Sequence, residues 1–165
     1  MDQQQPQWSP PPQQPTGWGG PGYGGPPARP TGVTLAGIFL IVMGVLALLA
    51  GVLALAGGAM FANMFQGPDG GLFAGLFAFI GVIILFWAIL HLVGGIGSLQ
   101  GKGWGRWTGI VVAVITVIFG VLGLLGSMGR TDAGGLVFQV VFIALYALTA
   151  WALIQASAWF AAARR

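Results

Sequence analysis

Apolar residues occupy four long stretches of this chain, and short polar segments separate them. The stretches cover residues 33–60, 72–99, 107–126 and 136–160. Each one, folded as a helix, is long enough to cross about 30 Å of hydrocarbon. The apolar residues form continuous blocks, whereas a soluble helix alternates an apolar and a polar face. The pattern predicts an all-α integral membrane four-helix bundle over residues 31–165, with antiparallel neighbours joined by short loops.

Small residues recur at regular spacings inside the first three stretches, every seven residues in the first two and at alternating steps of four and three in the third. A seven-residue period keeps such residues on one side of a helix, where a neighbouring backbone can approach closely. We expect these stripes to pack the helices into a closed bundle, with the third helix at its centre. The packing residues are Gly37, Gly44, Gly51 and Gly58 in the first stretch, Gly81 and Gly95 in the second, and Gly109, Gly120 and Gly123 in the third.

Residues 1–30 have a different composition. They are rich in Pro, Gln and Gly and contain no aliphatic residue larger than Ala28. Such a segment buries too little apolar surface to offset the entropy lost on ordering. We predict a disordered cytoplasmic tail. Its proline triplet could bind an aromatic groove, or the tail could be solvated without a dedicated partner.

The few charges indicate how the helices are oriented. The chain has six basic residues, three acidic residues and no cysteine. If the tail is cytoplasmic, five of the basic residues lie on that side and Arg130 alone lies on the other, so the positive-inside rule places both termini in the cytoplasm. Scattered charges of this kind do not form a nucleic-acid surface.

We expect basic and aromatic residues to anchor the cytoplasmic face in the membrane. Lysine and arginine attract anionic lipid headgroups, and tryptophan prefers the membrane boundary. The predicted anchors are Lys102, Trp104, Arg106, Trp107, Trp159, Arg164 and Arg165.

His91 is the candidate for chemistry, because an ionisable side chain inside a span is a functional hypothesis by default. Metal binding would need further ligands, yet the spans contain no Asp, Glu, Cys or second His. We therefore predict no catalytic, metal or cofactor site. We expect a neutral His91 bonded to Tyr146, Thr116 or Gln155 of another helix. Gln139 completes the candidate intramembrane polar group.

Two segments resemble a known group of proteins. Residues 92–114 read LVGGIGSLQGKGWGRWTGIVVAV, a Gly-rich helix end followed by a basic turn, Trp-x-Arg-Trp and a Gly/Val-rich span. Residues 29–48 read RPTGVTLAGIFLIVMGVLAL and follow the Pro/Gly/Gln-rich tail. This combination resembles small four-span membrane proteins of actinobacterial type, most of them uncharacterised. The resemblance implies a bacterial inner-membrane location and supplies no activity.

Two functional hypotheses follow. The first is a non-catalytic structural, scaffolding or accessory protein that assembles with itself or with other membrane proteins. The second is a small transporter or channel component with His91 near a polar path. A polar cavity that reaches His91 would favour the second hypothesis, and a dry interface would favour the first.

Overall fold

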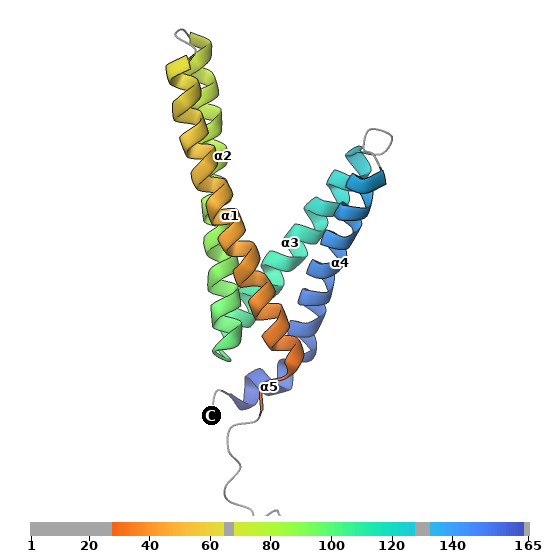
Figure 1. Ribbon diagram of the computed structural model, residues 1–165. Coiled ribbons are helices and arrows are strands. Elements are labelled where there is room, and N and C mark those ends of the chain that lie inside the picture. Colours follow the sequence, from red (N-terminus) through yellow and green to blue (C-terminus); the bar gives the residue numbers. More distant parts are fainter. Residues whose placement is uncertain (1–27, 65–67, 128–132, 164–165) are drawn as a thin grey trace, which may run out of the picture.

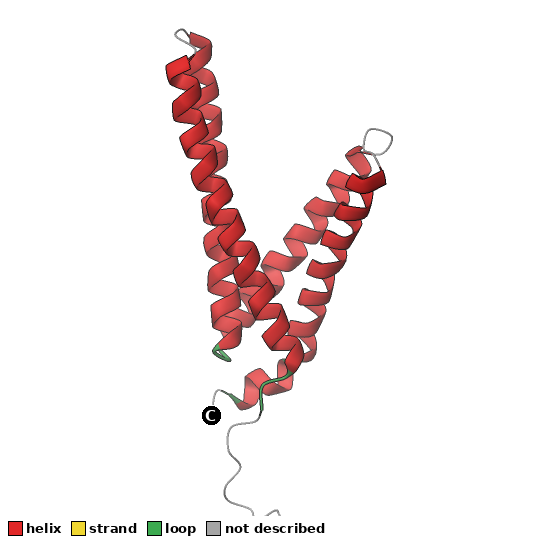
Figure 2. Ribbon diagram, viewed as in Figure 1, coloured by secondary structure: helices red, strands yellow, loops and turns green. Residues whose placement is uncertain are grey.

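The computed structural model describes residues 28–64, 68–127 and 133–163. Within these ranges the regular structure is entirely helical (Figure 2). The helices are α1 (Thr31–Met64), α2 (Pro68–Leu99), α3 (Gly103–Ser127), α4 (Ala133–Gln155) and α5 (Ser157–Ala162). Most of the predicted tail lies outside the described residues, as do Arg164 and Arg165.

The prediction of four membrane-crossing helices is confirmed. All four long helices have the length and the apolar composition of membrane spans. They extend beyond the predicted stretches, since α1 continues to Met64 and α3 begins at Gly103.

The prediction that residues 136–160 form a single helix is wrong. Helix α4 ends at Gln155, and the short helix α5 follows after Ala156, whose φ of −78° and ψ of 13° depart from helical values. Beyond this break the side chain of Phe160 is fully buried. The chain therefore turns across the end of the bundle instead of continuing in the direction of α4 (Figure 1).

The four long helices form two antiparallel hairpins that diverge like the arms of a V (Figure 1). Helices α1 and α2 pair along one arm, and α3 and α4 pair along the other. The arms meet at the end that holds the α2–α3 turn and α5. We call this end the base of the V. The expectation of a bundle closed along its whole length, with α3 at its centre, is wrong.

The buried core lies at the base. It is formed by apolar side chains from both arms and from α5, among them Val33, Leu40, Val112, Leu153 and Phe160. Farther from the base, most large apolar side chains are exposed, as expected of surfaces that face lipid. The two arms are thus held together at one end only.

The α1–α2 arm is built on the predicted stripe of small residues. An added Cβ at Gly51 would lie 3.2 Å from the carbonyl oxygen of Gly81, and one at Gly95 would lie 2.8 Å from that of Gly37. An added Cβ at Gly44 would meet Leu92, and one at Gly58 would meet Phe77. The matching seven-residue steps on two antiparallel helices keep these residues opposite one another along the whole arm.

In the α3–α4 arm the small residues of α3 receive side chains of α4. Ile143 fills the space over Gly120, and the Nε2 of Gln139 lies 3.0 Å from an added Cβ at Gly123. Gly109, nearer the base, faces Leu153 of α4 and Leu40 of α1. All the predicted packing glycines thus lie against a neighbouring helix.

The two arms cross most closely between α2 and α3, where Gly94, Gly97 and Gly105, which the predicted stripes do not include, lie beside Gly109, which they do. An added Cβ at Gly94 would lie 3.0 Å from the backbone nitrogen of Gly109, and one at Gly97 would lie 2.7 Å from the Cα of Gly105. Backbone meets backbone here with no side chain between. This crossing is the vertex of the V.

The turn between α2 and α3 has a Schellman arrangement. Gly101 has a φ of +72°. Its N–H donates to the carbonyl of Ser98 at 3.1 Å, and the N–H of Lys102 donates to that of Gly97 at 3.0 Å. These bonds satisfy carbonyls that a helix end leaves free, and the left-handed backbone favours glycine. The turn therefore reverses the chain within a few residues and sets α3 against α2.

Candidate functional site

The candidate site is a polar joint between the two arms, centred on His91 of α2. The side chain is only 2% exposed, although an ionisable group inside a membrane span is costly to place. The sequence indicates its position, because His91 lies near the stripe of small residues that faces α1. Burial between helices, away from lipid, follows from that position.

Both ring nitrogens of His91 have partners. Nδ1 lies 2.8 Å from the carbonyl oxygen of Trp87, one turn earlier on α2, and Nε2 lies 2.9 Å from the hydroxyl of Tyr146 on α4. Since a carbonyl only accepts, Nδ1 carries the proton and donates it to Trp87. Nε2 then accepts the hydroxyl hydrogen of Tyr146. This arrangement uses both hydrogen-bonding positions of a neutral imidazole, which is the form that burial away from water favours.

Aromatic rings surround this hydrogen bond. The ring of Tyr146 lies 5.0 Å from that of Phe39 on α1 and 4.9 Å from that of Phe142 on α4, measured between centroids. The ring of Trp87 stands edge-on to His91 at 5.7 Å. Edge-to-face pairs of this kind are favourable beyond their buried area. The joint therefore links three helices and both arms.

The other predicted polar residues do not converge on His91. The hydroxyl of Thr116 donates to the carbonyl of Val112 on its own helix at 2.8 Å. The amide of Gln139 donates to the carbonyl of Gly120 at 3.0 Å, within the α3–α4 arm. Gln155 is exposed at the end of α4. Of the three partners considered from the sequence, only Tyr146 bonds to His91.

Ser98 lies on α2 about two helical turns after His91, at the vertex. Its side chain is fully buried, and Oγ has no hydrogen-bond partner among the described residues. An added Cβ on Gly109 would lie 3.5 Å from this oxygen. The small side chain fits the close crossing of α2 and α3, where a larger one would separate the helices.

Arg106 has a role that the sequence does not reveal. Its Nε donates to the carbonyl of Leu153 at 2.9 Å, and Nη2 donates to that of Ile154 at 3.3 Å. These carbonyls belong to the last turn of α4, where helices lack N–H donors and attract cations. The guanidinium also lies 5.8 Å from the ring centroid of Phe160 in α5. Arg106 thus holds α3, the end of α4 and α5 together.

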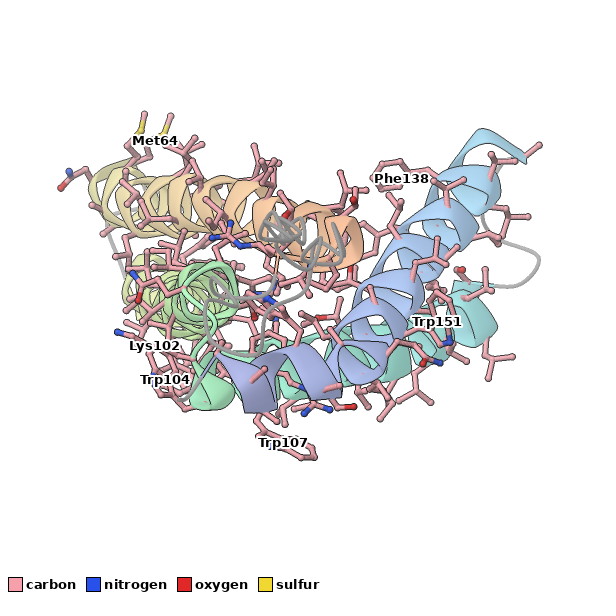
Figure 3. All side chains as sticks on the ribbon, turned by 90° about the horizontal axis from the view of Figure 1, so that it is seen from below. Met64, Lys102, Trp104, Trp107, Phe138 and Trp151 are labelled. Atoms are coloured by element: carbon pink, nitrogen blue, oxygen red, sulfur yellow. The ribbon has the colours of Figure 1, made fainter. Side chains whose placement is uncertain are left out.

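The predicted lipid anchors lie around the base, at the rim of the bundle. Lys102, Trp104 and Trp107 project outward when the molecule is viewed from below (Figure 3). The Nζ of Lys102 lies 5.8 Å from the ring centroid of Trp104, and both tryptophans are more than half exposed. Trp159 instead packs against Phe160, at 4.8 Å between centroids. The exposed members lie where a membrane surface can reach them.

Chemically, the joint can hold helices in place, because the Nε2 of His91 and the hydroxyl of Tyr146 bond to each other across the two arms. Among the described residues, no three His, Cys, Asp or Glu side chains gather closely enough to hold a metal ion.

The family comparison agrees with this picture of the membrane domain. A family model described as "Domain of unknown function (DUF7144)" matches residues 32–158, which include all four long helices. No curated protein and no solved structure matches the chain.

Proposed function

This chain belongs to the family described as a domain of unknown function (DUF7144), and we propose that it is a non-catalytic structural, scaffolding or accessory membrane protein. It acts in a bacterial inner membrane with both termini in the cytoplasm, as the charge distribution and the resemblance to actinobacterial four-span proteins favour. Its partners are other membrane proteins or further copies of itself.

The observation that carries this proposal is the closed polar joint. His91 is enclosed, and both of its nitrogens bond to groups of the same chain. A residue that conducts protons or binds a solute has to exchange partners, which requires water or substrate beside it. The joint supports a mechanical role, which is to fix the two arms at the base and leave their outer surfaces available to partners.

In this function the base is the part that faces the cytoplasm. Lys102, Trp104 and Trp107 set its depth at the lipid surface. Residues 1–27 precede α1, which begins at the base, and in this proposal they contact partners. Anchoring and partner binding thus occur on one side of the membrane.

Crosslinking in native membranes tests the proposal. An affinity-tagged full-length chain is treated with a membrane-permeable crosslinker, and the captured proteins are compared with those of a chain that lacks residues 1–27. We expect a reproducible set of membrane partners, part of which is lost with the tail. A full set retained by the shortened chain contradicts the role of the tail, and the absence of any specific partner contradicts the scaffold function.

The alternative of a transporter or channel component is favoured by one feature, the divergence of the arms. Because the bundle is not closed away from the base (Figure 1), several copies could enclose a path. Proteoliposome flux assays separate the two functions. A solute or ion flux that depends on His91 favours transport, and tight liposomes favour the scaffold.

A further inference from the structure

An apolar groove lies between α1 and α4, close to the base of the V. Its volume is about 390 Å³. It is lined by α1 from Gly32 to Phe39 and by α4 from Leu145 to Ala152. Seven residues of helix extend about 10 Å, so the groove runs from the end of the bundle well into the membrane. Because its sides are two membrane helices, it opens toward lipid.

The lining suits a hydrocarbon chain. Its side chains are aliphatic or aromatic apart from Thr149, whose hydroxyl donates to the carbonyl of Leu145 at 2.8 Å and is thereby satisfied. The one further polar side-chain atom of the lining is the indole nitrogen of Trp151, a residue that is 60% exposed. The groove therefore accommodates the apolar part of a ligand.

A basic residue, Arg29, lies three positions before Gly32, the first residue of the groove lining. The carbonyl of Pro30 accepts the N–H groups of Val33 and Thr34, at 3.0 and 3.3 Å, so α1 starts directly after this residue. Arg29 precedes Pro30 and is exposed, and the groove begins at Gly32. A cation at the membrane boundary beside an apolar groove complements a molecule with an anionic head and a hydrocarbon chain.

From these observations we infer that the groove binds one phospholipid with an anionic headgroup. One acyl chain lies between α1 and α4, and the phosphate lies beside Arg29. The lipid then fills the contact between the two arms on the side opposite the α2–α3 vertex. It is a ligand of the joint rather than part of the bulk bilayer.

Native mass spectrometry of the full-length protein in mild detergent tests the inference. Phosphatidylglycerol and phosphatidylcholine with identical acyl chains are added in equal amounts. We expect one retained lipid, with phosphatidylglycerol preferred about fivefold from one cation at the surface. Arg29→Gln is expected to bring this preference close to unity while retaining a lipid.

Two variants fill the groove. Ala152→Trp does so from α4 and Gly32→Leu from α1, and each is expected to lower occupancy by both lipids about tenfold. An added Cβ at Gly32 lies 3.5 Å from the Cβ of Ala152, an ordinary contact. Gly32→Leu therefore starts without a backbone overlap and serves as the second variant if Ala152→Trp does not fold. The matched control is Ala147→Trp, in a separate groove of about 290 Å³ between α3 and α4, which should leave occupancy unchanged.

Three results would overturn the inference. They are the absence of a retained lipid in the unmodified protein, undiminished binding by the folded Gly32→Leu variant, and a headgroup preference that disappears with Lys102→Gln but persists with Arg29→Gln. The last result would place the lipid at the α2–α3 turn.

Discussion

The close crossing of α2 and α3 predicts that Gly105→Ala separates the two arms. An added Cβ at Gly105 would overlap the backbone of Gly97 and lie 2.7 Å from the nitrogen of Ser98. Non-bonded heavy atoms prefer about 3.5–4.0 Å, so the helices have to move apart by about 1 Å. No side chain can rotate away, because the obstructing atoms belong to the backbone of the last turn of α2.

The expected cost follows from the size of such overlaps. Inserting a methyl group into a closely packed region typically costs about 1–3 kcal/mol. Alanine also favours a helix over glycine by about 1 kcal/mol, which partly offsets the cost. Gly75→Ala is the matched control, since it has the same effect on the helix while nothing lies within 4 Å of its Cβ. The difference in unfolding free energy between the two variants, about 1–3 kcal/mol, then measures the crossing alone.

Two measurements check this prediction. Unfolding in mixed micelles gives the free energy. Spin labels on introduced cysteines at Leu53 and Leu122, which are 70% and 57% exposed, give the distance between the arms. The chain has no cysteine of its own, so each label has one site. We expect a longer or broader distance distribution for Gly105→Ala. If this variant matches Gly75→Ala in stability and the unmodified protein in label distance, the vertex is not where the arms are held.

Three further predictions concern the joint, the end of α4 and the α1–α2 arm. Tyr146→Phe keeps the ring contacts but removes the hydroxyl that bonds to His91, and should cost about 0.6–2 kcal/mol; a double-mutant cycle with His91→Leu checks this, and additive effects would show that the bond contributes nothing. Arg106→Gln should speed hydrogen exchange in residues 156–163, because it removes the donors to the carbonyls of Leu153 and Ile154, whereas exposed Lys102→Gln should not; equal exchange in both variants would contradict the role of Arg106. Gly58→Ala, whose Cβ would lie 2.9 Å from that of Phe77, should destabilise the protein by about 1–2 kcal/mol relative to Gly57→Ala, whose Cβ would have open space. Equal stability of the two variants in the same micelle assay would show that the stripe of small residues does not contribute to the packing of this arm.

The sequence predicts those features that repeat along one helix. The α1–α2 arm could be anticipated because Gly37, Gly44, Gly51 and Gly58 share a period that a helix turns into one face. The vertex could not, because Gly97 and Gly105 form no such period. In the sequence they are typical of a Gly-rich turn, and only the three-dimensional arrangement of α2 and α3 brings them into contact.

The break at Ala156 also depends on tertiary contacts. Alanine is the strongest helix former, so nothing in residues 153–160 indicates a helix end. Burial of Phe160 and the bonds from Arg106 define it, and both require α3 beside α4. The joint could be predicted in part. The sequence indicates that His91 needs a polar partner from another helix, but the choice of Tyr146 depends on helix order, which the pattern of spans does not contain.

The unequal lengths of the two arms have a consequence for the bilayer around them. Helices α1 and α2 have 34 and 32 residues, and α3 and α4 have 25 and 23. At 1.5 Å per residue, the first arm is about 50 Å long and the second about 36 Å. Both exceed a hydrocarbon thickness of about 30 Å, and a long helix meets such an excess by tilting. With the arms joined only at the base, a thinner membrane tilts them in opposite directions and widens the V, while a thicker membrane brings them together. The distance between the arm tips thus depends on the thickness of the membrane in which the protein lies.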